Sequence, residues 1–374
     1  MPTQTPLKEI AKVFFRLGVI GFGGPAVHIA LMEQEIVKKR KWVSASEFMD
    51  VIGTTNLIPG PNSTEMTMHF GQERGGWKGL IVAGFCFITP AVITTMLFAW
   101  LYQRYGKLPQ FEPFIYGIMP AVIAIMLELI FNLGKKAIKS VPLLIIALMA
   151  AGLALLDINE IYLLFGAGFL GMIIYFTSSK WRSLNTFIPL ALWQIPAFAL
   201  DNRSWKIFWV FLKIGAILYG SGYVLYAFFD AEFVKTGILT KQQLIDAIAI
   251  GQLTPGPLFS SATFVGWQMG GFLGAVLASV GIFLPSFLYI AFLSPILPRL
   301  KKSKLFSAFL ETVNAVSIAL ILSVCINVGK TAITDWRTIT IAIVSFVILF
   351  IFKNLNKAFI IFGGAMMGYF LILI

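Results

Sequence analysis

Long apolar stretches separated by short polar segments dominate the chain. An α-helix needs about 20 apolar residues to cross a hydrocarbon core of about 30 Å, and ten stretches reach or approach that length. They lie at 10–31, 79–101, 113–133, 141–157 and 160–177 in the first half, and at 207–229, 272–293, 306–328, 338–352 and 358–374 in the second. The pattern predicts an all-α polytopic membrane protein with five crossing helices in each half.

The two halves are copies of one another. Residues 14–37 align with 211–234, and Asp50 to Pro61 align with Asp246 to Pro257. Further along, Gly71, Gly75, Gly76, Gly79, Pro90 and Asn132 match Gly266, Gly270, Gly271, Gly274, Pro285 and Asn327. Duplication in an apolar chain is typical of a transporter. We expect a first repeat at 1–183, a connecting apolar segment at 184–202 and a second repeat at 203–374.

Composition agrees with a membrane protein. Hydrophobic residues make up 58% of the chain, charged residues only 12%, and the mean hydropathy is +0.85, far from soluble averages. In a membrane protein, a net charge of +12 arises mainly from lysines and arginines in the loops, so it does not indicate a nucleic-acid partner. Cys86 and Cys325 both lie in apolar runs, so neither a disulfide framework nor a metal site is expected. No cofactor is expected either. No removable signal peptide is expected at the start.

The lysines and arginines predict how the repeats are oriented. If the KKRK loop at 38–41 lies inside, most other loop cations fall on the same side, as the positive-inside rule requires. An odd number of crossings then inverts the second repeat, provided that the segment 184–200, broken by Pro189 and Pro196, does not cross. If that segment crossed, the basic run at 299–304 would face outward. We therefore expect two inverted-topology repeats in a plasma membrane of the bacterial inner-membrane type.

Each repeat also holds a segment that is too short to cross. In the first hairpin (46–76), residues 46–58 and 62–73 would form helices of about 18–20 Å, enough to reach mid-membrane only. Their junction, here called the first tip, is Pro59, Gly60 and Pro61. The second hairpin (240–271) has the second tip at Pro255, Gly256 and Pro257. We expect re-entrant hairpins that enter from opposite faces and meet near the midplane, where the helix N-termini favour an anion. The alternative is that each tip is a packing kink.

Two blocks carry a family resemblance. The run FGGPAVHIALMEQEIV, followed by NLIPGPNSTEMTMHFGQERGGWKG, resembles the N-terminal signature of the chromate ion transporter family, and the second copy resembles the matching C-terminal half. The resemblance covers essentially the whole chain in its two-domain form. It implies movement of chromate, with sulfate as a related tetrahedral dianion, as efflux that confers chromate resistance. The second copy departs from the pattern with 219-YGSG-222 in place of FGGP and LFSSA after its tip.

Three sets of residues are candidates for binding such an anion. Arg16 and Lys213, equivalent in the repeats, are the cations left within predicted spans and could hold its two charges, or Arg16 could snorkel to a headgroup. The first helices are expected to break at Gly23, Gly24 and Pro25, and at Gly220, Ser221 and Gly222, where glycines allow close approach of a ligand or of another helix. Hydroxyl and amide donors at the starts of the returning helices are Asn62, Ser63, Thr64, Ser260, Ser261 and Thr263, which could equally serve as N-caps.

Two acids and a histidine are candidates for proton coupling. Glu65 and His69 are four residues apart and share a helix face, which suits a relay, although the spacing from Asn62 to Glu65 also fits a capping box. Glu128 lies mid-span, where the second repeat has Ser323. The acids at the ends of the first helices, Glu33, Glu35, Asp230 and Glu232, and those in the hairpins, Asp50 and Asp246, are expected in water near lysines.

These features together favour a secondary carrier for chromate-like oxyanions that works by alternating access about the two tips. The sequence has no GxxxxGK[ST] phosphate loop for direct ATP use. An anion channel of dual-topology design is the main alternative. A membrane-embedded enzyme would need an acidic metal cluster or a Ser/His/Asp set, and neither is evident. The expected partners are a small oxyanion and the lipid bilayer, and a homodimer is compatible with the sequence.

Overall fold

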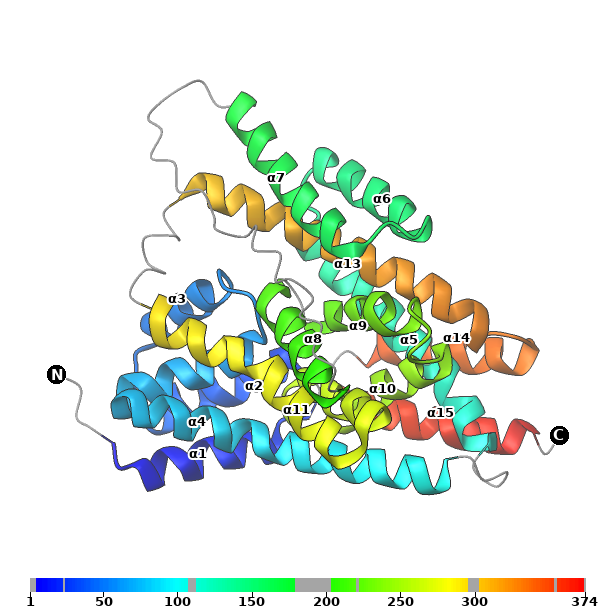
Figure 1. The fold of residues 1–374 in the computed structure, drawn as a ribbon, viewed down its shortest axis with the longest axis horizontal. Coiled ribbons are helices and arrows are strands. Elements are labelled where there is room, and N and C mark those ends of the chain that lie inside the picture. Colours follow the sequence, from blue (N-terminus) through cyan, green and yellow to red (C-terminus); the bar gives the residue numbers. More distant parts are fainter. Residues whose placement is uncertain are drawn as a thin grey trace.

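The computed structural model describes residues 5–22, 24–106, 112–178, 203–219, 222–294, 303–352 and 355–372 (Figure 1). Gly23, Gly220, Ser221 and the segment 184–200 lie outside these residues. The described chain is helical, with no strand in those ranges. The helices of the first repeat are α1 (Leu7–Ile20), α2 (Pro25–Met32), the π-helix η1 (Glu33–Lys39), α3 (Ala45–Thr55), α4 (Asn62–Tyr105), α5 (Glu112–Ala137), α6 (Val141–Leu155) and α7 (Glu160–Ser178).

The second repeat follows the same order. It comprises α8 (Arg203–Ile217), the 3₁₀ turn η3 (Gly222–Val224), α9 (Leu225–Phe229), the π-helix η4 (Asp230–Val234), α10 (Lys241–Leu253), the 3₁₀ turn η5 (Leu258–Ser260), α11 (Ser261–Leu293), α13 (Lys304–Ala332), α14 (Trp336–Ile351) and α15 (Lys357–Ile372). Capping boxes open the equivalent helices α3 and α10, from Ser44 with Glu47 and from Thr240 with Gln243. Local sequence therefore starts both hairpins in the same way.

A glycine pair divides each of the longest helices. Gly76 has φ 60° and ψ −150° in α4, and Gly271 has φ 60° and ψ −147° in α11, a backbone region essentially open only to glycine. After the kink the chain turns back on itself, so that a Cβ placed on Gly71 would lie 2.5 Å from the Gly79 carbonyl oxygen. Residues 62–74 and 77–105 are thus two antiparallel helices, and α11 is divided in the same way, with Thr263 hydrogen-bonded to Ser279 at 2.8 Å.

The equivalent helices after these kinks run antiparallel to each other. Trp77, at the start of the second part of α4, packs on Phe292 at the end of α11, with ring centroids 5.7 Å apart. At the other end, the indole of Trp267, which lies just before the kink of α11, donates to Gln103 at 2.6 Å. Gly84 lies between these contacts, against Phe287. The start of the one helix therefore lies beside the end of the other.

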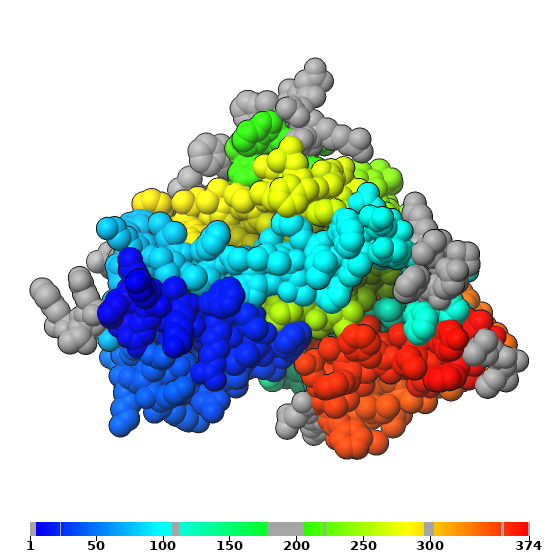
Figure 2. Space-filling model, turned by 90° about the horizontal axis from the view of Figure 1, so that it is seen from below, coloured from blue at the N-terminus to red at the C-terminus, as the bar shows by residue number. Residues whose placement is uncertain are grey.

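The remaining helices are exchanged between the repeats. α5 of the first repeat packs against α14 and α15 of the second, while α13 of the second repeat packs against α6 and α7 of the first. Small residues allow the close approach: Gly117 in α5 faces Gly364 and Gly368 in α15, and Gly171 in α7 faces Thr312 in α13. Seen from below (Figure 2), the orange and red surface of α14 and α15 lies beside the teal start of α5 and reaches the blue N-terminal helices.

Five described helices are long and apolar enough to cross a membrane: Asn62–Tyr105, Glu112–Ala137, Glu160–Thr177, Leu258–Leu293 and Lys304–Ala332. The apolar helices α6, α14 and α15 have 15 or 16 residues, about 23 Å of rise, which is shorter than a bilayer core. The predicted stretches 10–31 and 207–229 are each divided by a break rather than formed as one helix. Large apolar side chains are exposed on the outer helices, among them Phe85, Tyr162 and Phe359, as expected for contact with lipid.

Candidate functional site

The two tips lie at the centre of the molecule and bind the opposite repeat. The Gly60 amide donates to the Leu218 carbonyl at 2.9 Å, and the Gly256 amide donates to the Gly21 carbonyl at 2.8 Å. Gly60 and Gly256 are equivalent in the duplication, and so are Gly21 and Leu218. Each tip therefore caps the end of the broken first helix of the other copy, and the two contacts are reciprocal.

The prolines and glycines of the tips make this geometry available. The flanking prolines have no backbone N–H, so the glycine between them supplies the only donor of the tip. Gly60 has φ 134° and Gly256 has φ 86°, values that favour glycine. Space is also limited, because a Cβ on Gly60 would lie 2.5 Å from the Ser286 hydroxyl and a Cβ on Gly256 would lie 3.0 Å from that of Ala91.

The first helices break where the glycines predicted. α1 ends at Ile20, Gly24 has φ 86°, and Pro25 is the first residue of α2. In the second repeat α8 ends at Ile217 and helical structure resumes with η3 at Gly222. The breaks leave main-chain carbonyls at the ends of α1 and α8 free to accept from the tips.

His28 is a site residue that the sequence reasoning missed. Its buried ring lies against Phe87 at a centroid distance of 5.4 Å, and its Nε2 donates to the Gly21 carbonyl at 2.8 Å. Because a carbonyl can only accept, Nε2 carries a proton, and Nδ1 faces the Ser63 hydroxyl at 3.1 Å. His28 thus joins the break of the first helix to the start of the returning helix. The available signal was a polar ring in an otherwise apolar helix that follows the FGGP block.

The hydroxyls at the starts of the returning helices fall into two groups. Some have protein partners: Ser63 contacts His28, Ser261 lies 3.4 Å from the Tyr226 hydroxyl, and Thr263 bonds to Ser279. The side-chain amide oxygen of Asn62 accepts from the Thr55 hydroxyl at 2.5 Å. Thr64 and Ser260 are different. Both are buried, and their hydroxyl oxygens have no hydrogen-bond partner among the described residues. Buried hydroxyls without a protein partner mark a place for water or a ligand.

Glu65 lies beside the first tip. Its side chain is fully buried, and one carboxyl oxygen accepts from the Ser286 hydroxyl at 3.3 Å. The other oxygen has no hydrogen-bond partner, and no cation pairs with Glu65 in the part of the chain that the structure describes. A buried carboxylate without a counter-charge is costly. Glu65 is therefore a fully buried acid beside the first tip without a described counter-charge.

The predicted cations of the first helices lie in unlike surroundings. The Lys213 amine is 2.5 Å from the Glu232 carboxylate, in a pair that is partly buried. Arg16 is exposed and makes no ion pair within the described ranges. Glu35, equivalent to Glu232, instead pairs with Arg40 and Lys39 of the KKRK loop. The same acid thus has a different cationic partner in each repeat.

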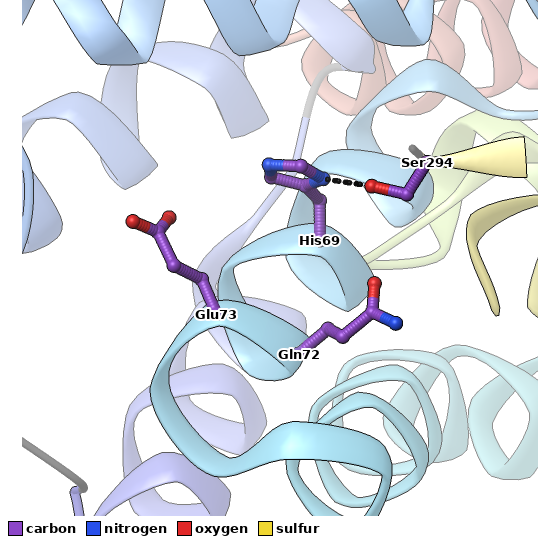
Figure 3. A pocket seen from close by; sticks show the side chains of 4 residues that line it. All are labelled: His69, Gln72, Glu73 and Ser294. Carbon is purple, nitrogen blue, oxygen red and sulfur yellow. Dashed lines mark hydrogen bonds between the residues drawn. The ribbon is translucent and has the colours of Figure 1, made fainter. Parts of the chain in front are cut away.

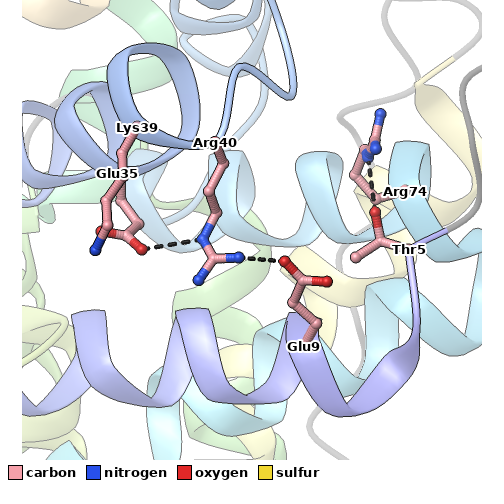
Figure 4. Close-up of polar contacts among 6 residues, drawn as sticks. All are labelled: Thr5, Glu9, Glu35, Lys39, Arg40 and Arg74. Atoms are coloured by element: carbon pink, nitrogen blue, oxygen red, sulfur yellow. Dashed lines mark hydrogen bonds and ion pairs between the residues drawn. The ribbon is translucent and has the colours of Figure 1, made fainter.

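Arg40 connects the π-helix η1 to α1 at this end of the first repeat (Figure 4). Its guanidinium bridges Glu35, at 3.0 Å, and Glu9 of α1. Burial would raise the pKa of Glu35, but hydrogen bonds and charge from Arg40 and Lys39 outweigh it and lower that pKa. The prediction that the end-of-helix acids lie in water near lysines holds for Glu33, which pairs with Lys38, but not for Glu35 and Asp230, which are buried. It is wrong for Asp246, which is buried and accepts from Tyr102 at 2.6 Å, because α10 packs against the first repeat.

A hollow of about 300 Å³ opens along the returning helix of the first hairpin. The hollow is lined by His69, Gln72, Glu73 and Ser294, the residue that follows α11. The His69 ring faces the Ser294 hydroxyl at 3.4 Å (Figure 3). His69 lies one helical turn from Glu65 on the same face. The helix therefore connects the hollow to the first tip.

Glu128, the remaining proton candidate, lies within an ion pair. Its carboxylate is 3.3 Å from the Lys357 amine and also accepts from Asn132. No cluster of three or more His, Cys, Asp or Glu side chains that could hold a metal occurs in the ranges that the structure describes.

Duplicated helices, long apolar spans and reciprocal broken helices define a multi-pass membrane protein of the transporter class. Residues 8–172 and 205–369 each match the family model described as chromate transporter. The chain therefore belongs to the chromate transporter family, with one copy of the family domain in each repeat. This family consists of transporters rather than enzymes.

Similar proteins agree with this membership. The chain is 29% identical over 352 residues to a probable chromate transport protein of Synechococcus elongatus, covering 91% of this chain and 89% of the relative. It is 28% identical over 377 residues to a chromate transport protein of Cupriavidus metallidurans, covering 98% and 93%. The uncharacterized transporter YwrB of Bacillus subtilis is 31% identical over 175 residues, 43% of this chain but 87% of the relative. No solved structure matches the chain.

Proposed function

We propose that this protein is a secondary transporter of chromate-like tetrahedral oxyanions that works by alternating access about the two tips, as an exporter in the plasma membrane. The reciprocal bonds from Gly60 to Leu218 and from Gly256 to Gly21 are the observation that supports this most directly. They bring two broken helices and two helix N-termini together at one place, the arrangement that many transporters use for a small ion. Family membership supports chromate, and sulfate has the same charge and shape.

An inverted topology with re-entrant hairpins is part of the proposal. The antiparallel run of 77–105 against α11 supports it, because equivalent helices of inverted repeats cross in opposite directions. On this view the first hairpin dips from the inside and the second from the outside. The test is single-cysteine labelling at Lys41 and Lys241 in a background without Cys86 and Cys325. Membrane-impermeant reagent should reach the two positions from opposite sides, and labelling of both from one side would overturn the inversion.

The proposed binding set is built from the donors at the tips. Thr64 and Ser260 offer buried hydroxyls without a described partner, and the helix N-termini after Pro61 and Pro257 add a positive electrostatic potential. The other proposed contacts are Arg16, Gly23, Gly24, Pro25, Asn62, Ser63, Lys213, Gly220, Ser221, Gly222, Ser261 and Thr263. A dianion with four oxygens needs several donors, which this arrangement can supply from both repeats.

Counterflow in proteoliposomes tests the function. Vesicles loaded with unlabelled chromate should accumulate labelled sulfate above the external concentration, since a carrier exchanges one anion for the other. A channel would only equilibrate the label and would cancel the membrane potential. Absence of any chromate- or sulfate-dependent flux in vesicles that contain folded protein would overturn the proposal. Uptake into inverted membrane vesicles would establish the export direction.

Proton coupling is proposed through Glu65, with His69 as its link to the hollow and Glu128 as a second candidate. An ionised Glu65 beside the tip would repel an anionic cargo, so binding of the anion favours the protonated acid. The lack of a cation beside Glu65 in the described chain supports this role.

A further inference from the structure

A second charged cluster lies beside the centre, and the proposed binding set does not include it. The Lys357 amine is 3.3 Å from a Glu128 carboxyl oxygen. The same amine donates to the Tyr223 hydroxyl at 3.4 Å and lies 5.1 Å from the centroid of the Tyr223 ring. The three residues come from α15, α5 and η3, so the cluster joins both repeats.

The cluster is deep within the helical bundle. The side chains of Lys357 and Glu128 are only 13% and 15% exposed. Lys357 is the first residue of α15. Its partner Glu128 lies nine residues before Ala137, where α5 ends. Nine residues correspond to about 13 Å along the helix axis. A charge at membrane depth is expensive and tends to be functional, with its partner close by.

The cluster also adjoins the second tip and both broken helices. A Cβ on Gly24 would lie 2.9 Å from the Tyr223 hydroxyl and 3.9 Å from Leu258, the residue that follows the second tip. Gly222 lies against Leu258 and Phe259. Tyr223 thus stands between Lys357 and the place where the two breaks meet.

The corresponding place in the first repeat has the opposite charge. Glu160 opens α7 as Lys357 opens α15, and its buried carboxylate is 2.8 Å from the Lys235 amine. Of the equivalent helices α7 and α15, only α15 of the second repeat therefore begins with a cation, Lys357. A lysine at a helix N-terminus is also opposed by the helix dipole, which makes the spot more electropositive.

We infer that Lys357 binds the anionic cargo and that Glu128 is its resting counter-ion, which the cargo displaces. The inference rests on the proposed function and adds a binding residue to it. A lysine amine has three donors; among described residues the Lys357 amine donates only to Tyr223 and is held to Glu128 as an ion pair. An oxygen of the cargo can therefore accept from a remaining N–H of this amine and then take the place of Glu128. The Glu128 carboxylate keeps its hydrogen bond from Asn132 when it is displaced. No covalent step is involved.

Equilibrium binding of labelled sulfate to the purified protein, with counterflow on the same samples, tests this. Lys357→Gln should weaken sulfate binding at least tenfold, and Lys357→Arg should restore most of it. Glu128→Gln should tighten binding severalfold, because the competing carboxylate is gone. The control is Lys139→Gln, which breaks an exposed pair with Glu311 whose side chains are 64% and 51% exposed. That variant should bind like wild type.

The outcomes separate this inference from the proposed function. If wild type neither binds nor exchanges chromate or sulfate, the proposed function itself is wrong. If wild type binds and exchanges, but Lys357→Gln binds like Lys139→Gln, only this inference is wrong. Weaker binding by Glu128→Gln would also overturn it, because that result means the pair is structural. Should Lys357→Gln fail to fold, by gel filtration and melting temperature, the Lys357→Arg and Glu128→Gln measurements decide.

Discussion

Alanine at either tip glycine is the most direct test of the central geometry. Gly60 and Gly256 have φ of 134° and 86°, and an L-residue there costs about 1–2 kcal/mol in backbone strain. The added Cβ would also meet Ser286 or Ala91 at 2.5 or 3.0 Å, and overpacking of a buried site costs about 1–3 kcal/mol more. We expect Gly60→Ala and Gly256→Ala each to destabilise the protein by about 2–5 kcal/mol.

Gly237 provides the matched control. It has φ 74°, but no atom lies within 4 Å of an added Cβ, so Gly237→Ala should lose only the strain energy, about 1–2 kcal/mol. The measurement is the shift in melting temperature of purified protein by tryptophan fluorescence, followed by sulfate counterflow. Both tip variants should shift more than the control and lose exchange. Equal shifts in all three variants, with exchange intact, would refute the idea that the tips are tightly packed against the opposite repeat.

Four further predictions follow from the site. Glu65→Gln should exchange sulfate for chromate but no longer respond to an imposed pH gradient; a response like that of wild type would remove Glu65 from proton coupling. Thr64→Val and Ser260→Ala should each raise the KM for sulfate about tenfold or more, since a hydrogen bond to a charged group contributes about 1.5–3 kcal/mol. Thr89→Val, at a half-buried residue whose hydroxyl donates to the Phe85 carbonyl, should not. His28→Phe keeps a ring against Phe87 but loses two hydrogen bonds, so the melting temperature should fall, and no fall would contradict the bridging role. Hydrogen bonds from the Ser44 backbone and hydroxyl lower the pKa of exposed Glu47; this stabilisation is complete above the ordinary value of 4.5 and is lost as pH falls through the lowered pKa. Wild type should therefore lose more melting temperature than Glu47→Gln between pH 7 and pH 4, and equal losses would show that the capping box is irrelevant to stability.

Several local elements could be predicted because their causes are local. The prolines and glycines of Pro59–Pro61 and Pro255–Pro257 interrupt helices wherever they occur, and Gly24 with Pro25 ends one helix and starts another. The predicted helices 46–58 and 62–73 correspond closely to α3 and the first part of α4. A hairpin that ends at 76 and a crossing helix that starts at 79 implied a reversal between them, and the structure has it at Gly75 and Gly76, the glycines matched to Gly270 and Gly271. Paired glycines permit a reversal, but only packing between the two helix segments requires it.

Side-chain partners were harder to predict because they come from distant parts of the chain. His28 meets Ser63 across 35 residues, and Glu65 meets Ser286 across 221. Lys357 immediately precedes the predicted span 358–374, yet it pairs with Glu128 because α15 starts at the depth of that residue on α5. Lys213 was expected to hold a charge of the anion, and its partner in the structure is Glu232. Residue spacing predicts which side chains are neighbours on one helix, but not which side chains of the other repeat pack against that helix.

The sequence by itself determined that this protein is a duplicated, helical membrane protein of the chromate transporter family, since composition, internal repeats and motifs are properties of the chain alone. Only the tertiary structure decided that each tip caps the broken helix of the other repeat, and that α5 and α13 pack within the opposite copies. The physical reason is that a free amide at Gly60 or Gly256 and a free carbonyl at Leu218 or Gly21 satisfy each other at short range. Which donor meets which acceptor depends on how the helices pack in three dimensions.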